Sequence, residues 1–178
     1  MPPDSKIDFL EFAKPVPART AELHQVRAIA GESRLILNRI DTQQKLINAH
    51  KVGASSLTIE AIILEDVLRL GFQSQRKGLF AAYAKSGIRP DFFVPVGRSG
   101  ILLEVERGKI LANNLDLPDL WKCHICCEAD YLFLLIPKYR PMNNGKKMPV
   151  FPRVSARLQT FFCAPNVINV EAAFLFGY

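Results

Sequence analysis

The sequence lacks the patterns that direct a protein into a membrane or an oxidising compartment. Its N-terminus has no basic segment followed by an apolar run, which a signal peptide would have. No apolar run reaches the roughly 18 residues that cross a bilayer. Three of its four cysteines are bunched within residues 123–127, unlike the spaced cysteines of a disulfide framework. We therefore expect a soluble cytoplasmic protein with reduced thiols and no membrane partner.

Two common site motifs are also missing. Cys123, His124, Cys126 and Cys127 carry the thiolate and imidazole groups that zinc prefers, but structural zinc usually takes two spaced pairs of ligands. On a helix, Cys123 shares a face with Cys126 and Cys127, as in a buried stripe of small residues. The glycine-bounded segment 97–100 has neither the lysine nor the following helix of a phosphate-binding loop. We therefore expect neither a zinc site nor such a loop.

The composition is that of a globular domain with a basic surface. With 178 residues, 49% of them hydrophobic, the chain can bury a sizeable core within one domain. Its formal net charge of +6 suits a polyanionic partner, although basic proteins without such a partner are common. Charge alone therefore gives weak support to nucleic acid as the ligand.

The segment 89–109 contains a predicted β-hairpin. Two short apolar runs, 92–96 and 101–105, flank the glycine-bounded tetrapeptide 97–100. If residue 96 pairs with residue 101, the numbers of paired residues sum to 197. This register places Asp91 opposite Glu106.

In the same register Glu104 lies opposite Phe93, so Asp91, Glu104 and Glu106 share one face because strand side chains alternate. Like charges directly opposite each other destabilise a sheet. A hard divalent ion such as Mg²⁺, which takes carboxylate oxygens, would neutralise this face. A solvated acidic face is the alternative interpretation.

The spacing of these residues resembles a known nuclease motif. Pro90-Asp91, twelve intervening residues and Glu104-Val105-Glu106 are similar to the motif of the PD-(D/E)XK nuclease superfamily. The lysine of that motif would stand at position 106, where this chain has a glutamate, as some restriction endonucleases of the superfamily do. If a lysine assists, Lys109 is nearest in sequence, and Lys77 and Lys122 are the other candidates.

The resemblance implies an endonuclease that hydrolyses DNA with Mg²⁺, for which Mn²⁺ can substitute. Asp91 and Glu104 would bind the metal, and the carbonyl of Val105 would complete its shell. Glu106 would serve as a ligand or as the general base. The first core helix of the superfamily often adds an acidic residue, which makes Glu60 a fourth metal ligand. The alternative for Glu60 is a structural role, because a carboxylate near the start of a helix interacts favourably with the positive end of the helix dipole.

The periodicity of apolar residues predicts an α/β fold. The resemblance implies a restriction-endonuclease-like αβββαβ core over residues 57–139, with a mixed central sheet flanked by helices. We expect an N-terminal arm and helical extension over 1–56, packed on a nuclease-like core over 57–178. The expected elements are an extended arm 1–19, two helices within 20–50 with a break near Gly31, a helix 57–70, a strand 72–75, a helix 113–129, a strand 131–139, a basic mobile loop 140–149, a helix 154–162 and a strand 167–176.

Several basic and polar residues are candidates for contact with DNA phosphates. They are Gln75, Arg76, Lys77, Lys146 and Lys147. The N-terminal helices offer a surface for a homodimer. Two alternatives remain: a catalytically inactive nucleic-acid-binding module that retains the nuclease fold, and a protein-interaction module.

Overall fold

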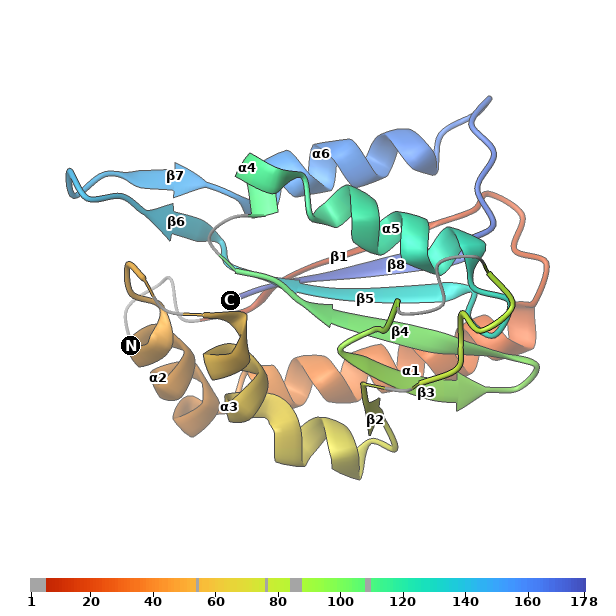
Figure 1. Ribbon diagram of the computed structural model, residues 1–178, viewed down its shortest axis with the longest axis horizontal. Coiled ribbons are helices and arrows are strands. Elements are labelled where there is room, and N and C mark those ends of the chain that lie inside the picture. The colour runs from red at the N-terminus through yellow and green to blue at the C-terminus, as the bar shows by residue number, and fades with distance from the viewer. Residues whose placement is uncertain (1–5, 54, 76, 84–87, 108–109) are drawn as a thin grey trace.

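The fold is a mixed six-stranded β-sheet with helices packed on both faces, as Figure 1 shows. This computed structural model describes residues 6–53, 55–75, 77–83, 88–107 and 110–178. The strands are β1 (Asp8–Ala13), β2 (Gln73–Ser74), β3 (Phe92–Val96), β4 (Ser99–Val105), β5 (Tyr131–Ile136) and β8 (Ala172–Gly177), in the order β1-β8-β5-β4-β3-β2. The predicted α/β class, with a mixed central sheet flanked by helices, is confirmed.

The helices form two layers, one on each side of the sheet (Figure 1). One layer consists of α1 (Thr20–Leu37), α2 (Ile40–Ala49) and α3 (Ser56–Arg69), and the other of α4 (Ile110–Asn113), α5 (Asp116–Ile125) and α6 (Phe151–Phe161). Each layer covers its own hydrophobic core. The segment Tyr131–Ile136 shows why: its odd-numbered side chains enter one core and its even-numbered side chains the other. The buried strand predicted over 131–139 is thus confirmed over Tyr131–Ile136 as β5, which is parallel to both β4 and β8, whereas Tyr139 begins another strand.

The N-terminal segment, expected as an extended arm, is extended and forms an edge strand of the main sheet. β1 pairs antiparallel with β8 at the edge of the sheet. The ring of Phe9 packs 5.2 Å from that of Phe176, and the ring of Phe12 stacks 6.2 Å from that of Phe162. The partner strand of β1 is remote in sequence, since Asp8 pairs with Gly177. Local composition therefore gave no sign of this pairing.

The break between the first two helices lies at Asn38 and Arg39, and not near Gly31 as predicted. α1 continues through Gly31, where a side chain would meet nothing within 4 Å. A glycine inside a helix costs only about 1 kcal/mol. Burial of Val26 and Ala30 against the core outweighs that cost.

Residues 139–149 form a two-stranded hairpin, which corrects the predicted loop. β6 (Tyr139–Pro141) pairs antiparallel with β7 (Lys147–Pro149) in a sheet of its own. Prolines in both short strands concealed the strand pattern.

No helix among the described residues has both the length and the apolar character needed to cross a bilayer.

Candidate active site

The hairpin that carries the predicted acidic residues is formed by β3 and β4, in a register two residues away from the predicted one. Val96 pairs with Ser99, so paired residue numbers sum to 195 and not to 197. Ser99 belongs to the strand because its hydroxyl accepts the backbone N–H of Asp130 at 2.8 Å. The turn is therefore only Gly97-Arg98. A shift of two residues leaves every side chain on its predicted face.

The corrected register brings Asp91 beside Glu104 and not opposite Glu106. The Asp91 backbone N–H lies 3.4 Å from Glu104 Oε2, and the Val105 N–H donates to Asp91 Oδ2 at 2.8 Å. Burial raises the pKa of Asp91, while the hydrogen bond from Val105 and the charge of Lys122 oppose that rise. Two of the predicted acids thus meet at the open end of the hairpin.

Helix α5 places a lysine and a further carboxylate over these acids. Lys122 Nζ lies 2.7 Å from Glu104 Oε1 and 2.9 Å from Asp119 Oδ1, and the side chains of Glu104 and Asp119 are only 3% and 4% exposed. Asp119 and Lys122 lie three residues apart, so one helical face presents both. Although burial lowers it, the pKa of Lys122 is raised above its usual range by the two carboxylates.

The remaining predicted acids lie around this ion pair. Glu106 follows β4, and its pKa is raised to about 8 by burial and by the carboxylates of Asp119 and Asp91. Glu60, on α3, is half-buried. Burial, followed by the charge of Asp91, raises the pKa of Glu60. Both residues therefore share the electrostatic environment of Asp91.

The cluster contains more carboxyl groups than its one lysine can neutralise. Burial raises the pKa of Glu104 well above its usual range and that of Asp119 to about 6, despite the ion pairs with Lys122. Asp119 Oδ2 is buried and has no hydrogen-bond partner among the described residues. Hard oxygen donors in excess over cations fit a divalent ion such as Mg²⁺.

The carboxylates of the cluster do not converge on one position where a metal ion could bind. Within the described part of the chain, no three Asp, Glu, His or Cys side chains are placed to hold a metal ion together. The Lys122 ammonium, which already contacts Glu104 and Asp119, explains this arrangement. The charge and chemistry of the donors therefore fit a metal, whereas their present positions suit the lysine.

The residues proposed for DNA contact are only partly close to the acids. Gln75 is exposed, and its backbone N–H donates to the Asp91 carbonyl at 2.8 Å. Lys77 is exposed beyond β2, and Lys146 and Lys147 are exposed on the β6–β7 hairpin. The predictions for Arg76 and Lys109 lie outside the described residues.

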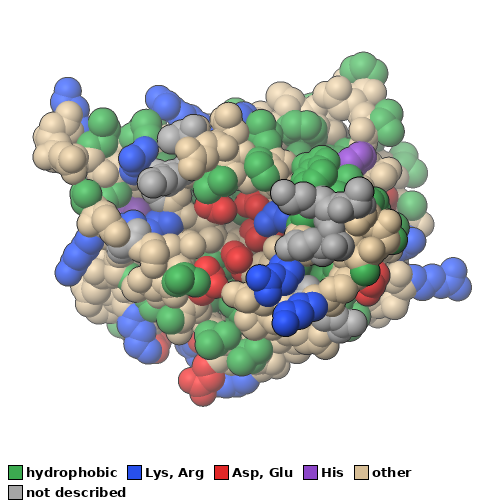
Figure 2. Space-filling model, in the orientation of Figure 1, with side chains coloured by type: hydrophobic (Ala, Val, Ile, Leu, Met, Phe, Trp, Pro, Cys, Tyr) green, Lys and Arg blue, Asp and Glu red, His purple; other side chains and the backbone are tan. Residues whose placement is uncertain are grey.

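A cleft of about 870 Å³ opens beside Glu106. It lies between the β6–β7 hairpin and the connection from α2 to α3, and Lys51, Arg107 and Arg140 line it. Figure 2, in the orientation of Figure 1, shows acidic side chains gathered at the centre of the visible face, with Lys and Arg side chains close beside them. Basic walls next to an acidic centre suit a polyanion whose reacting group sits at the acids.

The segment 123–127, which contains three cysteines and His124, includes both buried and exposed side chains. Cys123, on α5, is fully buried, and its thiol lies 3.9 Å from the Ala129 carbonyl. Burial raises the pKa of Cys123 well above its usual range. His124 Nδ1 accepts the Asn169 N–H at 3.0 Å. The predicted small buried stripe is thus realised at Cys123 and Cys126, while Cys127 is exposed.

Sequence reasoning missed Asp119 and ranked Lys122 below Lys109. The signal was present, because Asp119 and Lys122 stand one turn apart on the predicted helix 113–129, where most neighbours are apolar. The sequence did not indicate which face of the sheet this helix covers.

Comparisons with known proteins do not assign the chain to a family. No known protein family matches it, and no curated protein sequence does so either. One solved structure that it resembles is restriction endonuclease BglII complexed with a DNA 16-mer, with a TM-score of 0.49 and 13% sequence identity. The alignment covers 97% of this chain and 75% of that one.

Proposed function

We propose that this protein is a Mg²⁺-dependent endonuclease that hydrolyses phosphodiester bonds in DNA. One observation carries the proposal: Asp91, Glu104 and Lys122 converge at the end of the β3–β4 hairpin. The first two are the acids of the PD-(D/E)XK-like motif. The third provides, from α5, the cation that position 106 lacks. The chain order α3-β2-β3-β4-α4-α5-β5 supports the proposal, because it differs from the αβββαβ order that the motif implies only by the four-residue helix α4.

The acidic residues would hold the metal. Asp91 and Glu104 are its ligands, Glu60 is a further one, and the Val105 carbonyl completes the shell. This carbonyl suits the role because the Val105 N–H already points to Asp91, and a strand residue directs both backbone groups to the same neighbouring strand. A bound Mg²⁺ or Mn²⁺ supplies Lewis acidity that lowers the pKa of a water and stabilises charge on the phosphate.

The chain's own groups orient the reactants. Glu106 lines the cleft and would accept the proton of the attacking water or contact the metal. The Lys122 ammonium is held by Asp119 and would move from Glu104 to a phosphate oxygen of the substrate. Lys122 thus takes the role first considered for Lys109. The basic walls of the cleft would follow the DNA backbone.

A catalytically inactive nucleic-acid-binding module is the second candidate. It is favoured by the same ion pair, because an ammonium that neutralises Glu104 and Asp119 permanently would leave no room for a metal. Binding of Mg²⁺ or Mn²⁺, measured by calorimetry, separates the two candidates. The inactive module predicts DNA binding without metal binding.

The decisive experiment uses substitutions that preserve shape. Asp91→Asn and Glu104→Gln keep the size of each side chain and leave Lys122 its ion pair with Asp119, so we expect both variants to fold. Incubated with plasmid, linear and single-stranded DNA in Mg²⁺ or Mn²⁺, both should lose cleavage by at least 100-fold. Asp41→Asn, an exposed residue on α2, is the matched control and should cleave normally. Cleavage retained by Asp91→Asn would refute the site.

A further inference from the structure

The β6–β7 hairpin is an exposed ribbon that stands apart from the main sheet. Figure 1 shows it projecting beyond the end of the six-stranded sheet. Its tip is closed by hydrogen bonds from the Met142 N–H to the Lys146 carbonyl at 2.9 Å and from the Gly145 N–H to the Met142 carbonyl at 3.0 Å. Met142, Asn143 and Asn144 are all exposed at this tip. The ribbon thus presents two amide side chains to solvent.

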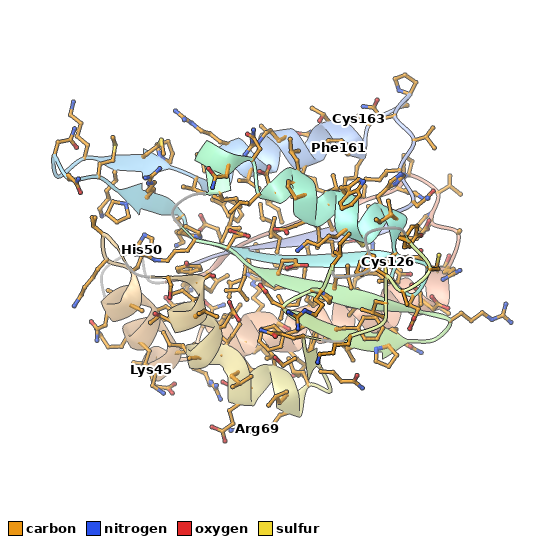
Figure 3. The ribbon with its side chains drawn as sticks, viewed as in Figure 1. Lys45, His50, Arg69, Cys126, Phe161 and Cys163 are labelled. Carbon is orange, nitrogen blue, oxygen red and sulfur yellow. The ribbon has the colours of Figure 1, made fainter. Side chains whose placement is uncertain are left out.

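The base of the ribbon is held firmly to the body. His50 Nε2 lies 2.6 Å from the Tyr139 carbonyl, and because a carbonyl can only accept, this nitrogen carries the proton. The His50 ring also packs edge-on against Tyr178, with centroids 5.6 Å apart. Figure 3 shows His50 between α2 and the hairpin. The hairpin therefore has a base attached to the body of the protein and a tip that is free to contact a ligand.

The amides at the tip are available for a ligand. Asn144 Oδ1 accepts the Lys146 N–H at 3.1 Å, which leaves its NH₂ group as a donor. The side chain of Asn143 has no hydrogen-bond partner in the part of the chain that the structure describes. Asparagine pairs with adenine through N6 and N7 in the major groove. Neither amide is needed to dock the ribbon on the body.

The surroundings of the ribbon are positively charged. Lys146 and Lys147 are exposed on it, and Arg140 faces the cleft that leads to Glu106. Lys147 Nζ lies 5.8 Å from the centre of the Tyr139 ring. Among the described residues that line the cleft, Glu106 is the sole carboxylate. The anionic backbone of a nucleic acid would therefore meet basic side chains in this cleft and a carboxylate at Glu106.

We propose that the β6–β7 hairpin enters the major groove of B-form duplex DNA and reads base edges with Asn143 and Asn144. The inference rests on the proposed function, because it places the same DNA in the cleft beside Glu106. The major groove of B-DNA admits a two-stranded ribbon, whereas that of A-form RNA is too deep and narrow for side chains to read. Lys146 and Lys147 would contact the flanking phosphates. The substrate is thus duplex DNA with a preferred sequence.

The experiment measures binding and cleavage separately. In EDTA, the full chain is used to select bound duplexes from a randomised DNA library. Its affinities for a selected duplex, the corresponding RNA duplex and the single strand are then measured by fluorescence anisotropy. We expect the DNA duplex to bind at least 10-fold more tightly than the RNA duplex. Asn143→Ala should reduce the preference for the selected sequence at least fivefold, with little change in affinity for random DNA.

A charge variant tests the phosphate contacts. Lys146→Ala should weaken binding to all duplexes and reduce the slope of log affinity against log salt by about 0.9, the value for one lost phosphate contact. Lys45→Ala is the matched control, since Lys45 is exposed on α2, where Figure 3 shows it away from the hairpin. Equal effects of the two lysine substitutions would overturn the proposal.

The outcomes separate this inference from the proposed function. A protein that selects a sequence through Asn143 but cleaves nothing in Mg²⁺ or Mn²⁺ would refute the nuclease and support the hairpin's role. A protein that cleaves DNA, while Asn143→Ala keeps the wild-type sequence preference, would support the nuclease and refute the role of the hairpin. Equal affinity for DNA and RNA duplexes would refute groove reading by this ribbon.

Discussion

Replacement of Lys122 by methionine tests the electrostatic centre of the site directly. Methionine keeps most of the length of the lysine chain and removes its charge. Lys122 is 17% exposed and lies within 3 Å of two carboxylates that are 3% and 4% exposed, so these contacts belong to the buried class of ion pairs. Removal of one partner from a buried pair costs about 3–5 kcal/mol, compared with about 0–1 kcal/mol for a surface pair.

The loss should depend on pH with a definite sign. Burial already holds the pKa values of Glu104 and Asp119 above their usual range, and removal of the ammonium raises them further. At neutral pH the folded variant must then either bury uncompensated charge or bind protons that the unfolded chain does not hold. Stability should therefore recover as the pH falls toward about 4, the unfolded carboxylate range.

Urea denaturation followed by the fluorescence of Trp121 and by far-ultraviolet circular dichroism measures the effect. With a slope of about 2 kcal/mol/M, the transition midpoint at pH 7.5 should fall by about 1.5–2.5 M. The double variant Lys122→Met with Glu104→Gln should regain part of the loss, because one uncompensated charge is gone. Lys45→Met, whose ion pair with Asp41 is exposed, is the control.

Metal binding adds a second readout to the same variants. If Mg²⁺ and the ammonium neutralise the same carboxylates, millimolar Mg²⁺ should stabilise Lys122→Met more than the wild type. A loss below about 1 kcal/mol at pH 7.5 would refute the idea that Lys122 neutralises this cluster. A loss that does not shrink on acidification would contradict the assignment of the effect to the carboxylates.

Two further predictions concern the stability of the frame around the site. Arg157→Ala should cost about 3 kcal/mol in urea denaturation, because Asp116 is fully buried and loses its 2.7 Å ion pair; a change below 1 kcal/mol would contradict this. Gly100→Ala should cost at least about 1–3 kcal/mol, because its Cβ would lie 2.5 Å from the Phe93 ring, whereas Gly31→Ala, in open space on α1, should stabilise the protein by up to about 1 kcal/mol. Equal melting temperatures for these two glycine variants would refute the packing around β4.

Much of the local structure could be predicted because the signals are short in range. The helix expected over 57–70 is present as α3, where Gly71 follows with a φ of 91° and ends it. The hairpin that carries Asp91 and Glu104 was also predicted, including the face on which both residues lie. The alternation of strand side chains and the local turn signal were sufficient for this.

The register and the edges of the sheet were less predictable. The turn of β3–β4 has two residues fewer than expected, because Ser99 is drawn into the strand by a bond to Asp130, 31 positions away. β1 pairs with β8, whose register links Asp8 to Gly177. Such pairings depend on partners that sequence patterns do not identify.

The sequence by itself determined the residue types of the site: a carboxylate pair in a short hairpin, with their spacing and their common face. Only the tertiary structure decided which cation meets them. Asp119 and Lys122 reach Glu104 because α5 packs on the face of β4 to which Glu104 points. Contacts within one hairpin follow from spacing along the chain, whereas contacts between a helix and a strand follow from how layers pack.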